Sequence, residues 1–223
     1  QIGQSFDGFA ISTDGGGTWG ILGGGLPSFT GKTLLELNAS NPNSVFASVS
    51  DSLIGKGLWK TTDFGTTWTQ LHNVNIPQSQ GWFSHLVAVH PTDSTKVVHG
   101  GVNMYKSTTG GSSPTQVTGI HVDQHAHEHH PTDPNILYVA NDGGIYRSTD
   151  FGSSYSNLSA GLQTAQFYNG FSNSTTDSSL AMGGTQDNAT AIYRGNASNW
   201  NIVIAGDGGW TAINPSDDLI MYG

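Results

Sequence analysis

The chain of 223 residues contains no cysteine and few basic residues. Without cysteine it forms no disulfide and offers no thiolate as nucleophile or metal ligand, although this absence assigns no cellular compartment. Lysine and arginine together number seven, and the two arginines, Arg147 and Arg194, lie far apart in the sequence. A nucleic acid held through its phosphates is therefore not expected as a partner.

Long apolar runs and helix-forming residues are also scarce. No apolar run approaches the ~20 residues that a membrane-spanning helix needs, so we expect no membrane span. Charged residues make up only 10% of the chain, and few Lys and Glu stand beside many Gly, Ser, Thr and Asn, which disfavours long helices. A hydrophobic fraction of 35% still suffices for a packed core, so we expect a folded chain.

One eight-residue motif recurs through the chain. Its pattern is [ST]-x-D-x-G-x-x-[WY], and its complete copies are Ser12–Trp19, Thr61–Trp68 and Ser148–Tyr155. A fourth copy, Ser107–Gly111, has lost the Asp and the aromatic residue. The third motif position falls at residues 14, 63, 109 and 150, so successive copies are 49, 46 and 41 residues apart. This spacing indicates a repeated structural unit.

Each residue type in the motif suits a tight hairpin. The Asp side chain accepts hydrogen bonds from the amides of the turn, the Ser or Thr hydroxyl adds a local bond, and Gly adopts a positive φ without strain. The aromatic residue is expected to cover the seam between neighbouring sheets. The motif therefore predicts structural rather than catalytic roles for six residues, which are Asp14, Asp63, Asp150, Trp19, Trp68 and Tyr155.

A second feature predicts turns between short strands. Asn41-Pro42, His90-Pro91, His130-Pro131 and Asn214-Pro215 each lie beside short apolar runs. Their prolines are 49, 40 and 84 residues apart, which predicts one further copy without proline near residues 172–177. The first full repeat then contains four expected strands, at Leu34–Leu37, Val45–Val49, Leu58–Thr61 and Thr67–Leu71. Four short strands in 40–50 residues are typical of a β-propeller blade.

On these motifs the chain resembles the secreted Asp-box (BNR-repeat) β-propellers, a superfamily that includes sialidases, xyloglucanase-type glycoside hydrolases and sortilin-like receptor domains. The resemblance covers essentially the whole chain. It implies an all-β propeller of four-stranded blades in a secreted, extracellular protein. A shared fold does not by itself fix a function, so the function has to be argued from the sites.

We expect a single propeller domain over residues 1–223. Full blades are predicted near residues 32–74, 82–118, 121–160 and 165–204. A fifth blade is expected to be shared between residues 208–223 and residues 1–22, which would join the chain ends and remove the open edge of the ring. The alternative is a fragment of a larger propeller that begins and ends in the same phase by chance.

Five of the nine histidines lie between residues 121 and 130. In an extended strand, residues 121, 123, 125, 127 and 129 would share one face, and four imidazoles with one carboxylate suit a divalent metal such as Zn²⁺. The expected metal ligands are His121, Asp123, His125 and His127. Histidines with purely structural hydrogen bonds are the alternative interpretation. Many Asp-box relatives look like H-x-D-Q-H here, but with Leu- or Phe-like residues at the positions of His127 and His129.

Asp-bearing, Gly-rich turns form a second set of candidates, at Asn141–Gly144, Gly184–Asn188 and Gly206–Trp210. They also look like motifs of the superfamily. At one mouth of a propeller they would bind sugar hydroxyls or Ca²⁺, whereas turn formation alone is the alternative interpretation. The expected ligand-binding residues are Asp142, Gln186, Asn188, Trp210 and Trp82, the two tryptophans by stacking on sugar rings.

Three functions remain open on this sequence. The first is a non-catalytic binding or scaffold module for glycans or an extracellular protein. The second is a glycoside hydrolase, which needs two carboxylates about 5–9.5 Å apart; Asp187 and Asp207 are the preferred pair, with Asp123 and Asp142 as further candidates. The third is a metal-binding module on the His-rich strand. Sialidase activity is not expected, because sialidases hold the substrate carboxylate with three arginines and this chain has two.

Overall fold

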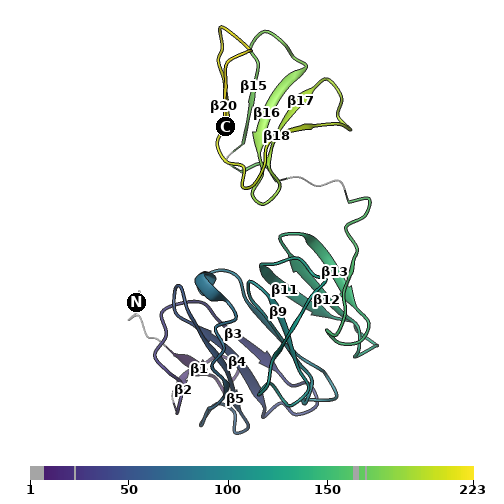
Figure 1. The fold of residues 1–223 in the computed structure, drawn as a ribbon. Coiled ribbons are helices and arrows are strands. Elements are labelled where there is room, and N and C mark those ends of the chain that lie inside the picture. The colour runs from purple at the N-terminus through teal and green to yellow at the C-terminus, as the bar shows by residue number, and fades with distance from the viewer. Residues whose placement is uncertain (1–7, 23, 163–165, 169) are drawn as a thin grey trace. The chain divides into compact units, whose positions relative to one another are not determined.

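The computed structural model describes residues 8–22, 24–162, 166–168 and 170–223. The chain divides into two compact units, residues 1–160 and residues 161–223, which we call the N-terminal and C-terminal units (Figure 1). Residues 1–7 of the predicted shared blade and residues 165 and 169 of the predicted fourth blade lie outside the described residues.

Four-stranded antiparallel sheets make up most of both units. Sheet I contains β3 (Thr33–Leu37), β4 (Val45–Ser50), β5 (Gly55–Thr61) and β6 (Thr69–His72). Sheet II contains β7 (Leu86–Val89), β8 (Val97–Gly100), β9 (Met104–Ser107) and β10 (Thr115–Val117). Sheet III contains β11 (Gln124–His129), β12 (Leu137–Asn141), β13 (Gly144–Ser148) and β14 (Ser156–Asn157). Sheet IV, in the C-terminal unit, contains β15 (Phe171–Asn173), β16 (Leu180–Gly184), β17 (Thr190–Arg194) and β18 (Asn201–Ile204).

The strands of each sheet pair in chain order, so the expected all-β class and its four-stranded repeat are confirmed. Two further sheets have only two strands. They are β1 (Phe9–Ile11) with β2 (Gly20–Leu22), and β19 (Ala212–Ile213) with β20 (Met221–Tyr222). These are the half blades expected from the two ends of the chain. Because they belong to different units, the shared fifth blade stays a prediction.

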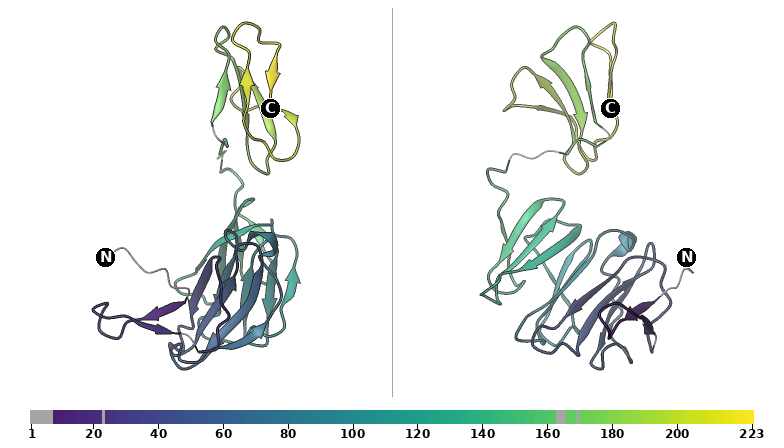
Figure 2. Two further views of the ribbon diagram at one scale, coloured as in Figure 1. Left: turned by 90° about the vertical axis from the view of Figure 1, so that its left-hand side faces the viewer. Right: turned by 180° about the vertical axis from the view of Figure 1, so that it is seen from behind.

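The three four-stranded sheets of the N-terminal unit lie side by side (Figure 2). Strand β7 contacts both β3 and β11, so the first strands of the three sheets gather along one line. Apolar side chains fill the space between the sheets. Phe46, Leu58, Val87, Val89 and Val97 pack between sheets I and II. Leu86, Ala88, Val98, Met104, Leu137, Val139 and Phe151 pack between sheets II and III.

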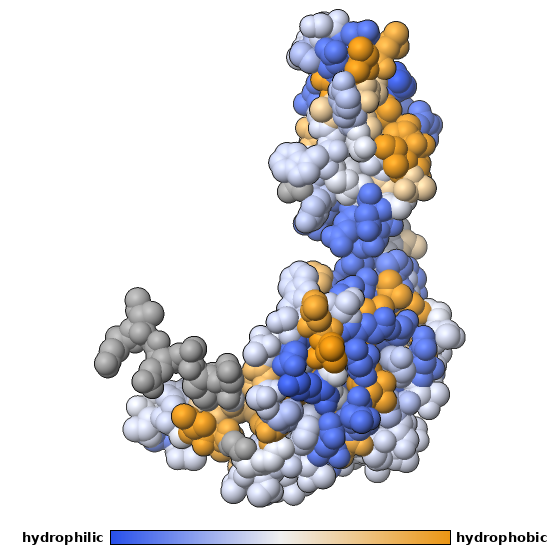
Figure 3. All heavy atoms as spheres, turned by 60° about the vertical axis from the view of Figure 1, so that its left-hand side comes forward, coloured by the Kyte–Doolittle hydropathy of each residue, from blue (hydrophilic) through white to orange (hydrophobic). Residues whose placement is uncertain are grey.

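The C-terminal unit has its own small core. Leu180, Met182 and Ile192 of sheet IV pack against Ile213 and Met221 of the sheet formed by β19 and β20. Figure 3 shows hydrophobic side chains at the surface of this unit among hydrophilic ones. Leu219 and Trp210 are its most exposed large apolar residues, at 91% and 75%. Among the described residues of the whole chain, no helix has the length and apolar character needed to cross a bilayer.

The repeated Asp motif forms the same hydrogen-bonded turn in its three complete copies. In the second copy, Asp63 Oδ1 accepts bonds from the Thr67 amide at 2.9 Å and from the Thr61 hydroxyl at 2.7 Å, while its Oδ2 accepts the Thr67 hydroxyl at 2.7 Å. Asp14 and Asp150 bind the equivalent groups of their own turns. The amide and hydroxyl donors lower the pKa of Asp14 and of Asp63 to about 2, because they stabilise the ionised carboxylates.

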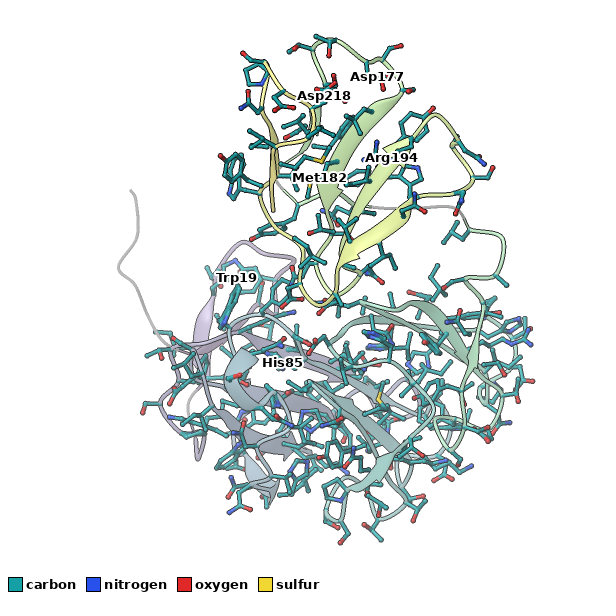
Figure 4. All side chains as sticks on the ribbon, turned by 45° about the horizontal axis from the view of Figure 1, so that its top comes forward. Trp19, His85, Asp177, Met182, Arg194 and Asp218 are labelled. Atoms are coloured by element: carbon teal, nitrogen blue, oxygen red, sulfur yellow. The ribbon has the colours of Figure 1, made fainter. Side chains whose placement is uncertain are left out.

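The aromatic residues of the motif differ in burial. Trp68 is 7% exposed and meets Phe9 in a tilted arrangement with ring centroids 5.5 Å apart, and Tyr155 packs against the cluster between sheets II and III. Trp19 is 66% exposed at the edge of the β1–β2 sheet (Figure 4). The Trp19 ring is therefore largely uncovered, and the expected covering of a seam is not seen for it.

The turns of the Asp motif need two consecutive left-handed residues. Phe64 has φ +57° before Gly65 at +88°, and Phe151 has φ +48° before Gly152 at +83°. Phe is strained in this conformation and Gly is not, so the motif tolerates strain at its first left-handed position. The ring of Phe64 is exposed, whereas the ring of Phe151 is buried.

A second turn recurs five times, once between the first two strands of every repeat. In each copy the backbone N–H of the first residue donates to the carbonyl six residues later, and its side chain accepts the N–H two residues later. The first residues are Asn38, His90, His130, Ser174 and Asn214. The copy without proline thus begins at Ser174, inside the predicted range 172–177. The expected alignment of Asn41-Pro42 is wrong by three residues, because Asn38 makes the equivalent bonds.

Candidate functional site

The backbone departs from regular strand geometry where β11 begins. Asp123 has a left-handed φ of +62°, and a register shift between Gln124 and Ala126 places His125 in a β-bulge opposite β12. The amides of Asp123 and Gln124 donate to the carbonyls of Val102 and Gly101 in the turn between β8 and β9. Strand β11 therefore starts only at Gln124, and the expected single face of residues 121, 123, 125, 127 and 129 does not form, because the bulge interrupts the alternation.

The buried side-chain amide of Gln124 stabilises the start of β11. Gln124 is fully buried; its Nε2 donates to the carbonyl of His121, and its Oε1 accepts Asn141 Nδ2 at 3.1 Å. Gly143 lies under the His121 ring, where any Cβ would come within 2.5 Å of that side chain. Gln124, Asn141 and Gly143 therefore have structural roles, and they fix the positions of Asp123, His125 and Asp142.

Three side chains lie together at the start of β11, those of Asp123, His125 and Asp142. His125 Nε2 is 2.6 Å from Asp142 Oδ1, and both side chains are partly exposed, at 29% and 21%. Asp123 is only 9% exposed and accepts a bond from Gln80 Nε2 at 2.9 Å. Burial, and then the neighbouring negative charge of Asp142, raise the pKa of Asp123. The carboxyl groups of Asp123 and Asp142 are thus neighbours, but Asp123 is nearly buried whereas Asp142 is partly exposed.

An exposed aromatic pair borders these carboxyl groups. Trp82 and Phe83 stack at 4.9 Å, and the edge of Phe83 meets His125 at 4.7 Å. Trp82 is 59% exposed and Phe83 is 43% exposed. Their backbone is held by Lys32, whose Nζ donates to the Phe83 carbonyl at 2.9 Å. We call Trp82, Phe83, Asp123, His125 and Asp142 the aromatic–carboxylate site.

The last histidines of β11 face Glu36 of β3. His127 Nε2 and His129 Nε2 lie 3.6 Å and 3.2 Å from Glu36 Oε1. Burial alone would raise the pKa of Glu36, but hydrogen bonds from the two histidines and their charges outweigh it, so the pKa is lowered. His129 also stacks on the buried ring of Phe151, with centroids 5.9 Å apart. Glu36 comes from the inner strand of sheet I and the histidines from that of sheet III.

The four predicted metal ligands have separate neighbours. His121 Nδ1 lies 3.1 Å from the backbone oxygen of Val122, Asp123 binds Gln80, His125 binds Asp142, and His127 faces Glu36. Among the described residues, the three-residue group whose ligand atoms all lie within 4.8 Å of one another is Glu36, His127 and His129. The predicted metal ligands are thus divided. Asp123 and His125 belong to the aromatic–carboxylate site, and His127 belongs to the group around Glu36. His121 belongs to neither group.

The remaining predicted residues belong to two adjoining turns of the C-terminal unit. Asp207 Oδ1 accepts the backbone N–H of Asp187 at 2.9 Å, and Asn188 Nδ2 donates to the Gln186 carbonyl at 3.0 Å. Asp187 has a left-handed φ of +60°. Trp210 follows the second turn. The turns bring Asp187 and Asp207 together, and one carboxylate oxygen of Asp207 is used to hold the turn; a catalytic role for the pair stays a prediction.

Sequence reasoning did not assign Phe83, Gln80 or Glu36 to a site. Phe83 follows Trp82 directly, so an aromatic doublet was a usable signal. Glu36 is the only charged residue in the strand Thr33–Leu37, in which three of five residues are leucine. A carboxylate in an otherwise apolar strand needs a hydrogen-bonding or charged partner when it is removed from water. Its presence in the sequence therefore indicates a polar cluster between strands. The bond between Gln80 and Asp123 spans 43 residues and has no sequence signal.

Comparison with known proteins shows that the chain is similar to parts of xyloglucanases. No family model matches it. It is 28% identical over 205 residues to a xyloglucanase of Hypocrea jecorina, a match that covers 89% of this chain and 20% of that protein. It is also 28% identical over 135 residues to xyloglucanase Xgh74A of Acetivibrio thermocellus, covering 48% of this chain and 16% of that protein.

One solved structure shows the same fold. An ancestral GH74 enzyme superposes with a TM-score of 0.50 and 16% identity, over 95% of this chain and 31% of that one. At this identity the likeness concerns the fold alone. The chain spans about one fifth of the length of the xyloglucanases it matches.

Proposed function

Because the chain is a distant relative of the GH74 xyloglucanases among the Asp-box β-propellers, we propose that it is a glycan-binding module of a secreted protein. The observation that carries the proposal is the aromatic–carboxylate site. There the exposed, stacked rings of Trp82 and Phe83 border the His125–Asp142 pair. The ligand class we assign is a neutral β-glucan such as xyloglucan.

The chemistry of the site matches that of such a polymer. Each face of a β-linked glucose ring carries C–H groups with partial positive charge, which are attracted to the negative face of an aromatic ring. The equatorial hydroxyls donate hydrogen bonds, and the carboxylate of Asp142 is an acceptor at the edge of the aromatic pair. A neutral polysaccharide is also not repelled by the net charge of −9.

Replacing Trp82 by Ala is expected to weaken xyloglucan binding about tenfold or more, since a lost stacking anchor commonly costs more than 1.4 kcal/mol. Affinity gel electrophoresis and isothermal titration calorimetry with soluble xyloglucan would measure the change. Trp19→Ala is the matched control, because Trp19 is a similarly exposed tryptophan elsewhere in the same unit. Binding that is equally weak, or equally strong, in both variants would rule out the aromatic–carboxylate site as the glycan site.

A second candidate function, glycoside hydrolysis, is favoured by one further observation. Asp123 is buried and its pKa is raised, whereas Asp142 is more exposed and binds His125. Glycosidases use two carboxyl groups in different protonation states. One is protonated and donates its proton to the leaving oxygen, and the other is ionised and serves as the nucleophile or the general base. The xyloglucanase relatives support this candidate as well.

If the chain hydrolyses xyloglucan, Asp123→Asn is expected to lower the rate of reducing-end release by a factor of about 10²–10⁴, the usual contribution of a general acid. Binding should persist, because the amide keeps the size of the carboxyl group. Asp187→Asn and Asp207→Asn serve as comparison, since they test the pair predicted from the sequence. Absence of turnover in the unchanged chain would reject hydrolysis and leave glycan binding in place.

A further inference from the structure

A cluster of three possible metal ligands lies apart from the aromatic–carboxylate site. Glu36 projects from β3, and His127 and His129 project from one face of β11, two residues apart. Glu36 Oε1 lies 3.6 Å from His127 Nε2 and 3.2 Å from His129 Nε2. One ligand atom from each of the three side chains lies within 4.8 Å of the other two. All three residues belong to the N-terminal unit.

These separations fit a bound zinc ion. A tetrahedral Zn²⁺ with bonds of about 2.0–2.1 Å holds neighbouring ligand atoms roughly 3.3–3.4 Å apart, which is the edge of such a tetrahedron. The two measured oxygen–nitrogen distances bracket this value within a few tenths of an ångström. For these two pairs an ion would need only small side-chain adjustments, and the third separation in the group is no more than 4.8 Å. Two imidazoles and one carboxylate are also donors that Zn²⁺ prefers.

The surroundings of the cluster hold its ligands but leave one side open. His129 stacks on Phe151, which is fully buried, and the rings of His127 and His129 meet edge to face at 5.4 Å. The three side chains are 17–24% exposed, so water can reach them. Three protein ligands with an accessible fourth position form an open site rather than a closed structural one.

We propose that Glu36, His127 and His129 form a divalent metal site that binds one Zn²⁺ ion. The ion joins the inner strands of sheets I and III, and a water molecule completes its coordination. The site shares only His127 with the set expected from the sequence. It is independent of the proposed glycan binding, which uses other residues.

The proposal is tested on the full chain without a polyhistidine tag. The protein is stripped with EDTA, dialysed and titrated with ZnCl₂ while calorimetry records binding; elemental analysis then gives the stoichiometry. We expect one Zn²⁺ per chain and a rise in the thermal unfolding temperature, because the ion binds the folded state. Substitution with Co²⁺ should give the visible absorption of a tetrahedral complex with nitrogen and oxygen ligands.

The variant Glu36→Gln keeps the shape of the side chain and removes its charge. It should weaken Zn²⁺ binding by at least about 100-fold, more than the 10–100-fold that a change outside the ligands costs. His129→Gln should do the same. His121→Ala and His125→Ala are matched controls from the same segment and should keep the affinity of the unchanged chain.

Other outcomes would overturn the proposal. Stoichiometric binding that survives Glu36→Gln and His129→Gln would place the metal elsewhere. Loss of binding in His125→Ala but not in Glu36→Gln would favour the set expected from the sequence. If no Zn²⁺ binds, the cluster is a hydrogen-bonded pairing of Glu36 with two histidines and nothing more. Circular dichroism and unfolding temperature of each variant show that it is folded.

Discussion

Replacing Phe151 by Ala is expected to destabilise the N-terminal unit by about 3–5 kcal/mol, the usual cost of removing a buried aromatic ring. Phe151 is fully buried in the cluster between sheets II and III, and its ring contacts His90 edge to face at 4.7 Å as well as stacking on His129. The cavity would lie between two sheets whose backbones are fixed by their own ladders, so it can collapse only in part. Urea unfolding followed by tryptophan fluorescence and circular dichroism measures the loss.

Phe64→Ala is the matched control for this experiment. Phe64 occupies the same position of the Asp motif, also with a left-handed φ, but it is 52% exposed. Both substitutions place Ala in the same strained conformation, so their difference isolates the buried ring. We expect the control to change the free energy of unfolding by less than about 1 kcal/mol. Equal losses of unfolding free energy in the two variants would mean that burial of the Phe151 ring adds no stability beyond the effect of placing Ala in the turn.

The second large effect is expected on lowering the pH from 7 to 4.5, which should destabilise the N-terminal unit by several kcal/mol. Three histidines, of which His85 and His99 are buried and His72 is partly buried, form one hydrogen-bonded chain across sheets I and II. The Ser48 hydroxyl oxygen lies 2.8 Å from His85 Nδ1 and 2.8 Å from His99 Nε2, and His99 Nδ1 lies 3.2 Å from His72 Nε2. His85 lies in the interior of the N-terminal unit (Figure 4).

The chain of bonds is satisfied only when all three histidines are neutral. The Val74 amide donates to His72 Nδ1, so a neutral His72 carries its proton on Nε2 and donates to His99 Nδ1. His99 then donates from Nε2 to Ser48, and Ser48 donates to His85 Nδ1. A second proton on His99 would point its Nδ1 donor at the Nε2 donor of His72. A second proton on His85 would leave the Ser48 hydroxyl hydrogen without its acceptor, in a place from which water is excluded.

Burial lowers the pKa of His72 and of His85 to about 4, and that of His99 well below its ordinary value of 6.5. In the unfolded chain these groups take up protons near pH 6.5, so acid favours the unfolded state as soon as the pH falls below that value. The stability they contribute is present above pH 6.5 and is lost progressively as the pH falls toward 4. For His85 alone the shift corresponds to about 3 kcal/mol.

Urea midpoints measured at pH 7, 6, 5 and 4.5 test this expectation, and the points at pH 5 and above lie mostly above the range in which carboxylates titrate. His72→Gln should keep the stability at pH 7, because the amide group can accept from Val74 and donate to His99 as the neutral imidazole does, and it should reduce the loss on acidification. His130→Gln, at an exposed turn, is the control and should keep the pH dependence of the unchanged chain. A midpoint that does not move between pH 7 and 4.5 would contradict the assignment of a neutral histidine chain.

The features that could be predicted from the sequence are those with short-range causes. The Asp motif forms its hydrogen bonds within seven consecutive residues, with Thr61 and Thr67 both donating to Asp63, so its pattern in the sequence is enough to predict its turn. The same holds for the recurrent turn at Ser174, which was located without its proline. The four strands of each repeat follow from these two turns, because they fix where each strand ends.

The candidate site was predicted only in part. Trp82, Asp123, His125 and Asp142 were selected, but their grouping was not, because it depends on a bulge at His125 that moves this side chain out of line with His127 and His129. Two identical turn positions, Phe64 and Phe151, likewise differ in burial for a reason that lies outside the motif. Only the neighbouring sheets decide which of the two rings is covered.

The sequence by itself therefore determined the repeat, the four-stranded sheets and the turn roles of the Asp residues, because these depend on neighbouring residues along the chain. The tertiary structure alone decided which partner each histidine meets. Glu36 and His129 are 93 residues apart and meet because the first strands of the sheets gather along one line. Contacts of that kind arise from packing between sheets, so the spacing of residues within one strand does not predict them.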